Sequence, residues 1–317
     1  MAEFLIMLKN VLIFIALAIP AYLLTRKKSL KGEDCGALSQ ILLYVAMPFL
    51  VFYSSLDITL NGQTALEFLL VGVLTAGGQL ICCLLTGFLP GLEKDGHEKG
   101  VMRFSMVFGN NGFLGLPLVA ALFSDILPIT VAYFAIIGTI TNLLILAVGG
   151  YLIAGQKSTI SAKGILTNPV LIAFVLGIAA NLLDVTTLLP EVETFAEHLK
   201  NMVTPISMCI IGIKFGEMKL GQLLRDRKLY YVVFIRLVLL PALVAVILLL
   251  VRLVLPISDA LIIALFIGFA MPTATMTTSL AVQYNIPGNS ATVYVLGTTL
   301  FSVVTLPILY SLLQIFL

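Results

Sequence analysis

The sequence predicts an all-α polytopic membrane protein with ten transmembrane helices, arranged as two inverted five-helix repeats. Three observations carry this prediction: a very apolar composition, a regular succession of long apolar stretches, and two stretches interrupted by helix-breaking residues. Of the 317 residues, 60% are hydrophobic and only 11% are charged. This composition is too apolar for one soluble core of this length, so the lipid bilayer is the solvent that suits the chain.

Apolar stretches long enough to cross a bilayer follow one another along the chain. A hydrocarbon core of about 30 Å requires about 20 apolar residues per helix. Reading for such stretches between polar breaks predicts ten spans, at residues 4–25, 36–56, 64–89, 101–123, 127–154, 168–186, 201–216, 229–254, 259–283 and 290–316.

Lys and Arg residues are concentrated in alternate loops. Cytoplasmic loops retain positive charge during insertion, so the loops after the first, third, fifth and seventh spans are predicted to be cytoplasmic. Their basic residues are Arg26, Lys27, Lys28, Lys31, Lys94, Lys99, Arg103, Lys157, Lys163, Lys219, Arg225, Arg227 and Lys228. We therefore expect a multi-pass protein of the cytoplasmic membrane with both termini outside the cytoplasm.

The predicted link after the fifth span divides the chain into two halves. Residues 1–154 form the first five-helix repeat, residues 155–167 a cytoplasmic linker, and residues 168–317 the second repeat. The halves must face the membrane in opposite senses, and Gly138-Thr139 in the fifth span has an echo in Gly297-Thr298 of the tenth. Inverted repeats support alternating access in many carriers. Chance similarity between Gly- and Thr-rich membrane helices is the alternative.

The fourth span contains residues that disfavour a continuous helix. Its centre reads Gly109-Asn110-Asn111-Gly112, and Gly115 and Pro117 follow. Gly has a low helix propensity, Asn competes for backbone hydrogen bonds and Pro lacks a donor, so the helix is expected to open near Gly109. Backbone groups freed at membrane depth cannot face lipid, so the break must line a hydrated cavity or be buried in protein.

The ninth span contains a matching break at Met271-Pro272-Thr273, with Thr275 just after it. Pro272 suits the first turn of a new half-helix because its missing amide hydrogen is not needed there. Breaks at corresponding positions of inverted halves are expected to cross near the midplane and to present half-helix N-termini, which carry partial positive charge. This predicts an anion site. The alternative is that Gly and Pro only allow close packing or a kink.

The crossover supplies the candidate site residues. Arg236, in the eighth span, is a further candidate: it is either a snorkelling anchor or partner of backbone carbonyls, or an attractor for a substrate carboxylate. No metal or cofactor is assigned, although Asn110, Asn111 and Thr275 could equally coordinate a sodium ion. The predicted substrate-binding residues are Asn110, Asn111, Gly112, Pro272, Thr273, Thr275 and Arg236, with Gly109, Gly115, Pro117 and Met271 as crossover backbone.

The remaining polar residues are expected to have structural roles. Gln79 is expected to join helices by hydrogen bonds, Glu67 to be solvated beside an outer loop, and Lys214 to pair with Glu217. No carboxylate lies clearly in the middle of a span, so a proton relay through a membrane acid is not predicted. Coupling to sodium, to a proton carried by the substrate, or to neither stays open.

Several function classes can be compared on motifs alone. The chain lacks His-Glu-x-x-His, paired intramembrane aspartates and the aspartate-rich clusters that hold magnesium, so an intramembrane enzyme is not expected. Secondary transport is the predicted function. A channel or a non-transporting solute sensor of the same fold is the alternative.

With these motifs, the chain resembles the auxin efflux carrier family of membrane transport proteins, which includes plant auxin exporters and many bacterial carboxylate permeases. The matching residues are Gly109-Asn110-Asn111-Gly112-Phe113-Leu114-Gly115-Leu116-Pro117, Arg236-Leu237 with Pro241, and Met271-Pro272. The resemblance implies a ten-span fold similar to that of sodium/bile acid symporters. Spans 1, 2, 6 and 7 would form a scaffold domain, and spans 3, 4, 5, 8, 9 and 10 a transport domain.

The resemblance also implies a substrate class. Bacterial members of the family suggest a small organic anion such as malate, malonate or lactate, and a sodium-coupled symporter of bile-acid-type anions is the alternative. The expected partners are this anion and the lipid bilayer, without nucleic acid, and a homodimer is left open. Only residues 155–167 stand where plant auxin exporters have a long hydrophilic loop, which argues against auxin as the substrate.

Overall fold

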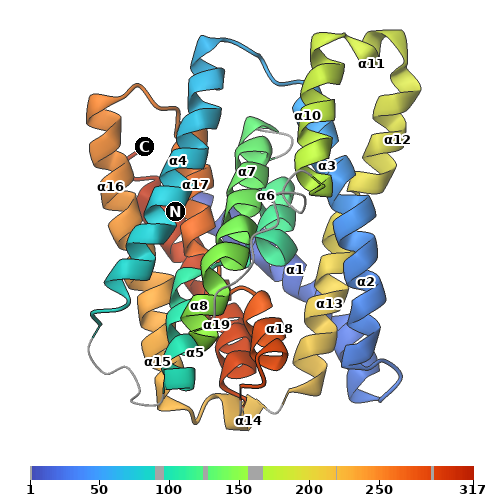
Figure 1. Cartoon of the computed structure of the whole chain (residues 1–317). Helices are drawn as coiled ribbons and strands as arrows, with labels where there is room; N and C mark the ends of the chain where they lie inside the picture. Colours follow the sequence, from blue (N-terminus) through green and yellow to red (C-terminus); the bar gives the residue numbers. More distant parts are fainter. Residues whose placement is uncertain (1, 90–95, 124–127, 156–166, 219, 287–288) are drawn as a thin grey trace.

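A computed structural model of the chain describes residues 2–89, 96–123, 128–155, 167–218, 220–286 and 289–317 (Figure 1). These residues form helices and no β-strand. Five helical segments within them are long and apolar enough to cross a membrane, and several shorter helices are also apolar. The five are Gly32–Leu56, Gly62–Leu85, Ile129–Ile153, Arg227–Val254 and Ser290–Leu313. The chain is thus an all-helical, multi-pass membrane protein, whereas ten spans in an inverted repeat stay a prediction.

The helices of the N-terminal half follow the apolar stretches of the sequence. Polar residues that break these stretches also cap the helices: the Asn61 side chain, for example, accepts a hydrogen bond from the Thr64 amide at 2.9 Å. The elements are α1 (Ala2–Arg26), η1 (Gly32–Asp34), α2 (Cys35–Ile41), η2 (Leu42–Ala46), α3 (Met47–Leu56), α4 (Gly62–Leu85), α5 (Gly96–Val107), η3 (Asn111–Gly115), α6 (Leu116–Phe123), α7 (Pro128–Leu144), η4 (Ile145–Gly149) and α8 (Gly150–Ala154). The predicted linker at 155–167 lies almost wholly outside the described residues.

The C-terminal half adds a helix that the hydropathy pattern misses. Residues 190–200 are hydrophilic and lie between two predicted spans, yet they form the helix α12, which begins at Pro190 and packs against α3. The elements are α10 (Pro169–Leu182), α11 (Val185–Leu188), α12 (Pro190–Lys200), α13 (Val203–Glu217), α14 (Leu220–Leu223), α15 (Arg227–Phe234), η5 (Ile235–Leu239), α16 (Leu240–Val254), α17 (Asp259–Ala270), α18 (Met276–Gln283) and α19 (Ser290–Leu313).

Several helices contain a π-helical turn, and three of these turns precede a proline. Leu42–Ala46 is followed by Pro48, Asn111–Gly115 by Pro117 and Ile235–Leu239 by Pro241. Proline removes a backbone donor and clashes with the preceding turn, and the wider turn accommodates this loss. The turn before Pro241 contains Arg236, so the local distortion sets the direction of this side chain.

The packing places α17 at the centre of the molecule. All of its residues from Ala260 to Ala270 are buried, as expected for a helix that is apolar on every side. It packs against α4, α7 and α16, while α1 packs against α13 and α3 against α10 (Figure 1). The predicted division into scaffold and transport domains stays a prediction. The central position of α17 matters because it ends at the break of the ninth predicted span.

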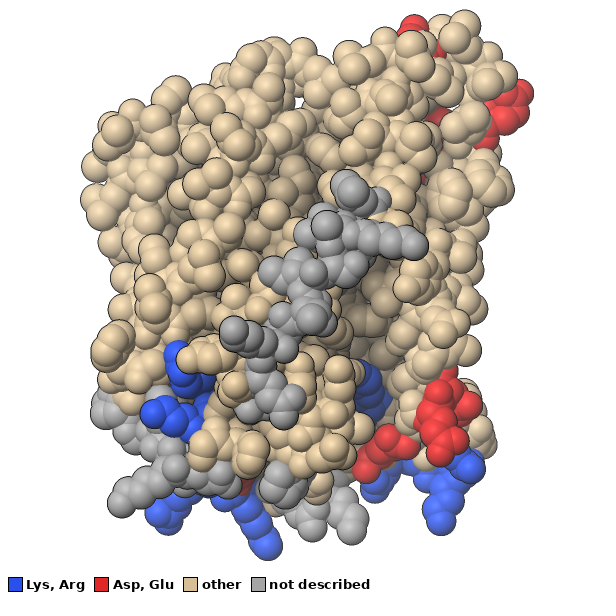
Figure 2. Space-filling model, viewed as in Figure 1, with Lys and Arg blue, Asp and Glu red and all other residues tan. Residues whose placement is uncertain are grey.

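Charged side chains are distributed unequally between the two ends of the molecule. Figure 2 shows the visible Lys and Arg side chains at the lower end, together with several acidic ones, whereas the upper end by α11 and α12 shows acidic side chains. Lys94, Lys157, Lys163 and Lys219 are outside the described residues. This asymmetry agrees with the loop pattern of the sequence, and the assignment of the basic end to the cytoplasm stays a prediction.

Candidate crossover site

The two predicted breaks lie side by side. α5 ends at Val107 and α17 at Ala270, and the segments that follow run antiparallel with a backbone bridge between Gly109 and Thr273. The Asn110 amide donates to the Pro272 carbonyl at 2.7 Å, and the Ala274 amide donates to the Phe108 carbonyl at 2.9 Å. Each break thus satisfies backbone groups that the other releases, which membrane depth requires.

The glycines of the fourth predicted span have different surroundings. A Cβ at Gly109 would collide with the guanidinium nitrogen Nη2 of Arg236, and one at Gly115 would collide with the Phe134 ring. A Cβ at Gly112 would meet no atom within 4 Å. Gly109 and Gly115 are therefore required for the close approach of Arg236 and Phe134, respectively. The half-helix that begins at Asn111, in contrast, has open space beside Gly112.

Arg236 lies at the centre of the crossover, with only 1% of its surface exposed. Its Nε donates to the Met271 carbonyl at 2.8 Å, and its Nη1 donates to the carbonyls of Val107 at 2.8 Å and Met106 at 3.2 Å. One side chain therefore joins the C-terminal ends of α5 and α17. These contacts match the sequence alternative in which Arg236 is a partner of backbone carbonyls.

The other terminal carbonyls of α5 also have partners. The Thr273 hydroxyl donates to the Ser105 carbonyl at 2.8 Å, and the Thr273 amide donates to the Thr298 hydroxyl at 3.0 Å. With the Phe108 carbonyl bonded to Ala274, every carbonyl from Ser105 to Phe108 is hydrogen-bonded. Helix ends normally leave four carbonyls without partners, and here the opposite break and Arg236 satisfy them.

The second half-helices begin directly beyond the bridge. η3 starts at Asn111 and continues into α6, which contains the buried Pro117, while α18 starts at Met276 after Thr275. The first amides of a helix have no acceptor within it and carry partial positive charge. The crossover thus brings two positively polarised helix N-termini beside a buried arginine.

Asn111 belongs to a buried polar cluster between α4 and α7. Its Nδ2 and the Nε2 of Gln79 both donate to the Thr141 hydroxyl, at 3.0 and 2.6 Å, and this hydroxyl donates to the Ile137 carbonyl at 2.7 Å. Gln79 therefore joins helices, as predicted. The carbonyl oxygens of Asn111 and Gln79 are buried and have no hydrogen-bond partner among the residues that the structure describes. Of the candidates, Asn110 is also buried and Thr275 is half-buried.

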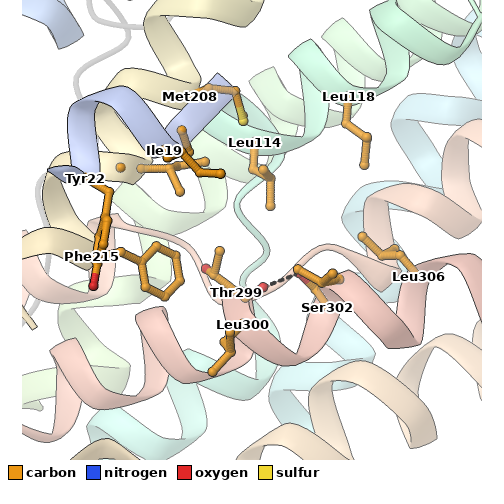
Figure 3. Close-up of a pocket in the computed structure, with 14 residues that line it drawn as sticks. Ile19, Tyr22, Leu114, Leu118, Met208, Phe215, Thr299, Leu300, Ser302 and Leu306 are labelled. Carbon is orange, nitrogen blue, oxygen red and sulfur yellow. Dashed lines mark hydrogen bonds between the residues drawn. The ribbon is translucent and has the colours of Figure 1, made fainter. Parts of the chain in front are cut away.

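A mostly apolar cavity of about 270 Å³ adjoins the crossover (Figure 3). It lies between α1 and α13 on one side and η3, α6 and α19 on the other, with Leu114 in its wall next to the half-helix N-terminus. Thr299 and Ser302 also line this wall, but their hydroxyls donate to the carbonyls of Val295 and Thr299, respectively. The cavity separates helices that the family resemblance predicts to form the scaffold from helices that it predicts to form the transport domain.

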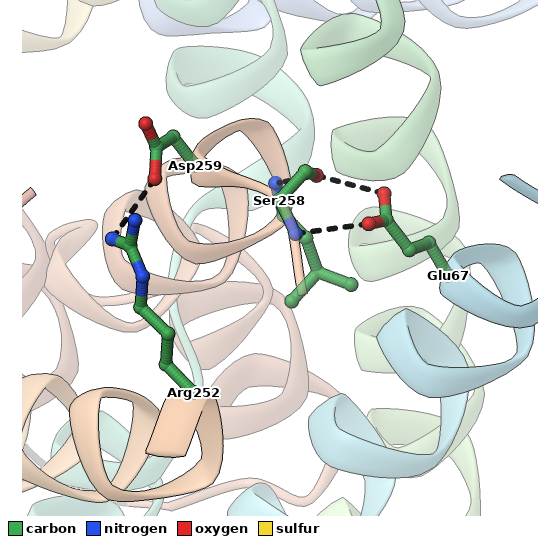
Figure 4. A network of polar contacts seen from close by, with 5 residues as sticks. Glu67, Arg252, Ser258 and Asp259 are labelled. Carbon is green, nitrogen blue, oxygen red and sulfur yellow. Dashed lines mark hydrogen bonds and ion pairs between the residues drawn. The ribbon is translucent and has the colours of Figure 1, made fainter. Parts of the chain in front are cut away.

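Glu67 is a buried acid that the sequence reasoning placed in solvent. Only 3% of its surface is exposed, and its carboxylate accepts hydrogen bonds from the Ser258 amide at 2.9 Å and the Ser258 hydroxyl at 2.7 Å (Figure 4). It also accepts one from the Tyr133 hydroxyl. The expectation of a solvated Glu67 is therefore wrong. The available signal was its position inside the predicted span 64–89, where a lone acid needs partners. Glu67 ties α4 and α7 to the N-terminus of α17.

No group of three or more His, Cys, Asp or Glu side chains in the described part of the chain could hold a metal ion. The polar groups at the crossover are instead amides, hydroxyls, backbone groups and one guanidinium. This set can bind an anion through its donors or a monovalent cation through its carbonyl oxygens.

Comparison with known proteins places these features in a family. A family model described as a membrane transport protein matches residues 6–164 and 157–310. A transporter of uncharacterized function from Methanothermobacter thermautotrophicus is 25% identical over 95% of this chain and 96% of its own length. A Rhizobium meliloti protein whose name proposes malonate transport is 26% identical over 93% of this chain and 92% of its own length.

Proposed function

The chain belongs to the membrane transport protein family, and we propose that it carries a small organic anion across the cytoplasmic membrane by alternating access at the crossover. Family and relatives are transporters and not enzymes. The finer proposal rests on the crossover geometry, in which two helix breaks pair at the centre of the molecule.

The contacts of Arg236 carry the preference for an anion. A crossover of two broken helices brings together two negative C-terminal ends and two positive N-terminal ends. Arg236 occupies the negative ends by donating to the carbonyls of Met106, Val107 and Met271. The helix N-termini at Asn111 and Met276 keep their partial positive charge, so the net field at the open side favours negative charge.

A carboxylate is the anion that these donors suit best. Amide groups at a half-helix N-terminus can donate to both oxygens of one carboxylate, and the open space beside Gly112 leaves room for its approach. The relative whose name proposes malonate supports a small carboxylate of the malonate, malate or lactate class. In this proposal Arg236 favours the anion indirectly, by binding the carbonyls at the negative helix ends. The residues around the bound anion are Asn110, Asn111, Gly112, Pro272, Thr273 and Thr275.

One observation favours a coupled variant of this function. The carbonyl oxygens of Asn111 and Gln79 are buried acceptors without a hydrogen-bond partner in the described ranges. Buried acceptors of this kind are ordinary ligands of a monovalent cation. A sodium ion that binds there together with the anion is the second candidate, and it would make the protein a sodium-coupled symporter.

A thermal-stability panel of the purified protein tests the proposal. Malonate, malate and lactate are added as sodium and as choline salts, with chloride salts of equal ionic strength as controls. A ligand raises the melting temperature only if it binds the folded state. We expect stabilisation by at least one carboxylate and a smaller effect in Asn111→Ala. No shift with any carboxylate contradicts the anion site, while a shift that requires sodium selects the symporter.

Flux in proteoliposomes separates a carrier from a channel or a sensor. A carrier shows saturable uptake of the stabilising carboxylate and counterflow against the same anion inside. A channel shows flux that does not saturate, and a sensor shows binding without flux. Counterflow is the expected result.

A further inference from the structure

A second cavity, which is more polar and has a volume of about 450 Å³, lies at the basic end of the molecule. It separates α13 from α18 and α19, which belong to the predicted scaffold and transport domains, respectively. Lys214 and Glu217 of α13 line one side, and Thr278, Asn289 and Thr292 line the other. Unlike the apolar cavity beside the crossover, this one is lined by an ammonium group, a carboxylate, hydroxyls and an amide.

The backbone of α13 directs Lys214 into this cavity. Gly212 and Gly216 lie four residues apart and pack against α1, where a Cβ would meet Ala18 and Thr25, respectively. Lys214 is two residues from each of them and therefore projects from the opposite face of the helix. Close packing of the glycine face thus sets the orientation of the lysine.

Lys214 forms no ion pair with any residue that the structure describes, although Glu217 lines the same cavity. The predicted pair between the two is not formed, and the Glu217 carboxylate instead accepts a hydrogen bond from the Gly32 amide at 2.5 Å. Within the described ranges Lys214 makes no hydrogen bond or ion pair, and its side chain is half-buried. A partly buried ammonium without a partner has a desolvation cost that an incoming anion can offset.

The Lys214 cavity is lined by helices that also approach the crossover. Thr278 is three residues from Thr275, where the half-helix α18 begins beside the crossover. Farther along the same pair of helices, Phe215 of α13 and Leu300 of α19 line the apolar cavity, which reaches Leu114 of η3. The Lys214 cavity and the apolar cavity are therefore both lined by α13 and α19.

We propose that Lys214 forms a recognition site for the carboxylate of the transported anion, on the cytoplasmic side of the crossover. The site rests on the proposed transport function and on the predicted orientation of the chain. The ammonium attracts the carboxylate into the cavity, and Thr278, Asn289 and Thr292 donate hydrogen bonds to it. A cation in a narrow cavity acts more strongly than one on an open surface, because less water screens it.

Labelled malonate flux in proteoliposomes gives the first test, with KM measured separately from each side. Lys214→Gln should raise the cytoplasmic-side KM about tenfold and leave the outer-side KM within about twofold, and Lys214→Arg should restore most of the loss. Arg225→Gln is the matched control, because Arg225 is exposed on the same end outside the cavity. Equal cytoplasmic-side KM values for Lys214→Gln and the wild type would overturn the proposal.

A second readout does not depend on transport. The native cysteines are first replaced by alanine, and Thr292→Cys then places a single thiol in the cavity wall. The rate at which this thiol is modified is measured with an anionic and with a cationic methanethiosulfonate. Lys214→Gln should lower the anionic-to-cationic rate ratio by about threefold to tenfold, from the Coulomb energy of one nearby charge, and Arg225→Gln should not. An unchanged ratio refutes the site. A changed ratio without any carboxylate flux would leave the anion-attracting cavity standing and refute the transport function.

Discussion

Replacement of Arg236 by Met tests whether this side chain holds the crossover together. Met has a similar apolar volume but no donor, so Arg236→Met leaves the carbonyls of Met106, Val107 and Met271 without their partner. A hydrogen bond to a charged group contributes about 1.5–3 kcal/mol, which makes the gross loss about 4–9 kcal/mol. Removal of a buried charge offsets several kcal/mol of this loss, so we expect a net destabilisation of about 2–4 kcal/mol.

The expected loss can be measured as a melting temperature in detergent. Cys35, Cys82 and Cys83 are buried, so a thiol-reactive fluorophore reports their exposure as the protein unfolds. A change of 1 kcal/mol shifts the melting temperature of a large domain by about 2–4 °C, so Arg236→Met should melt about 5–15 °C lower.

Arg252→Met is the matched control for this measurement. Arg252 pairs with Asp259 at 2.9 Å, but their side chains are 36% and 53% exposed. An exposed ion pair contributes at most about 1 kcal/mol, so this variant should melt within a few degrees of the wild type. Equal shifts in the two variants would refute the assignment of Arg236 as the link between the two broken helices.

Three further variants test neighbouring features. Gly109→Ala should displace the Arg236 guanidinium and destabilise the fold by about 1–3 kcal/mol. Gly138→Ala, whose Cβ would have its nearest neighbour at 4.0 Å, should not destabilise it. Equal melting temperatures of the two variants would contradict the close approach of Gly109 and Arg236. Glu67→Ala should lower the free energy of unfolding by about 2–4 kcal/mol because it leaves the Ser258 amide without an acceptor. Glu67→Gln should lower it less because the Gln side chain retains an acceptor oxygen. Similar melting temperatures of the wild type and both variants would show that the fold does not need the buried carboxylate. Asn111→Ala should lower carboxylate flux at least about tenfold, while the variant still inserts and purifies as a folded, monodisperse protein. Flux equal to that of the wild type would exclude Asn111 from the binding site.

The sequence predicts the helical architecture because each polar break is also a capping or turn signal. Asn61, for example, ends an apolar stretch and caps α4. The positions of the breaks could also be predicted from the sequence, since Gly109 and Pro272 lie in clusters of residues that disfavour a continuous helix. Helix ends and helix breaks depend on residues that are close together in the sequence, so the sequence alone is enough to predict them.

Features that depend on distant partners could not be predicted in the same way. The contacts of Arg236 join residues that lie 35 to 130 positions apart in the chain. Glu67 was misread because Ser258, its main partner, is 191 positions away. The pairing of Lys214 with Glu217 was expected from helical spacing, which does not reveal the competing amide of Gly32.

Counterflow of labelled malonate in proteoliposomes tests the central claim most directly. Vesicles that contain the protein and unlabelled malonate should accumulate the label transiently, and Asn111→Ala vesicles should not, because alternating access exchanges one bound anion for another at the crossover. Other small carboxylates inside the vesicles should also drive accumulation of the label, in the order in which they raise the melting temperature of the purified protein. Absence of counterflow with every carboxylate that stabilises the protein would contradict transport of a small organic anion by this chain.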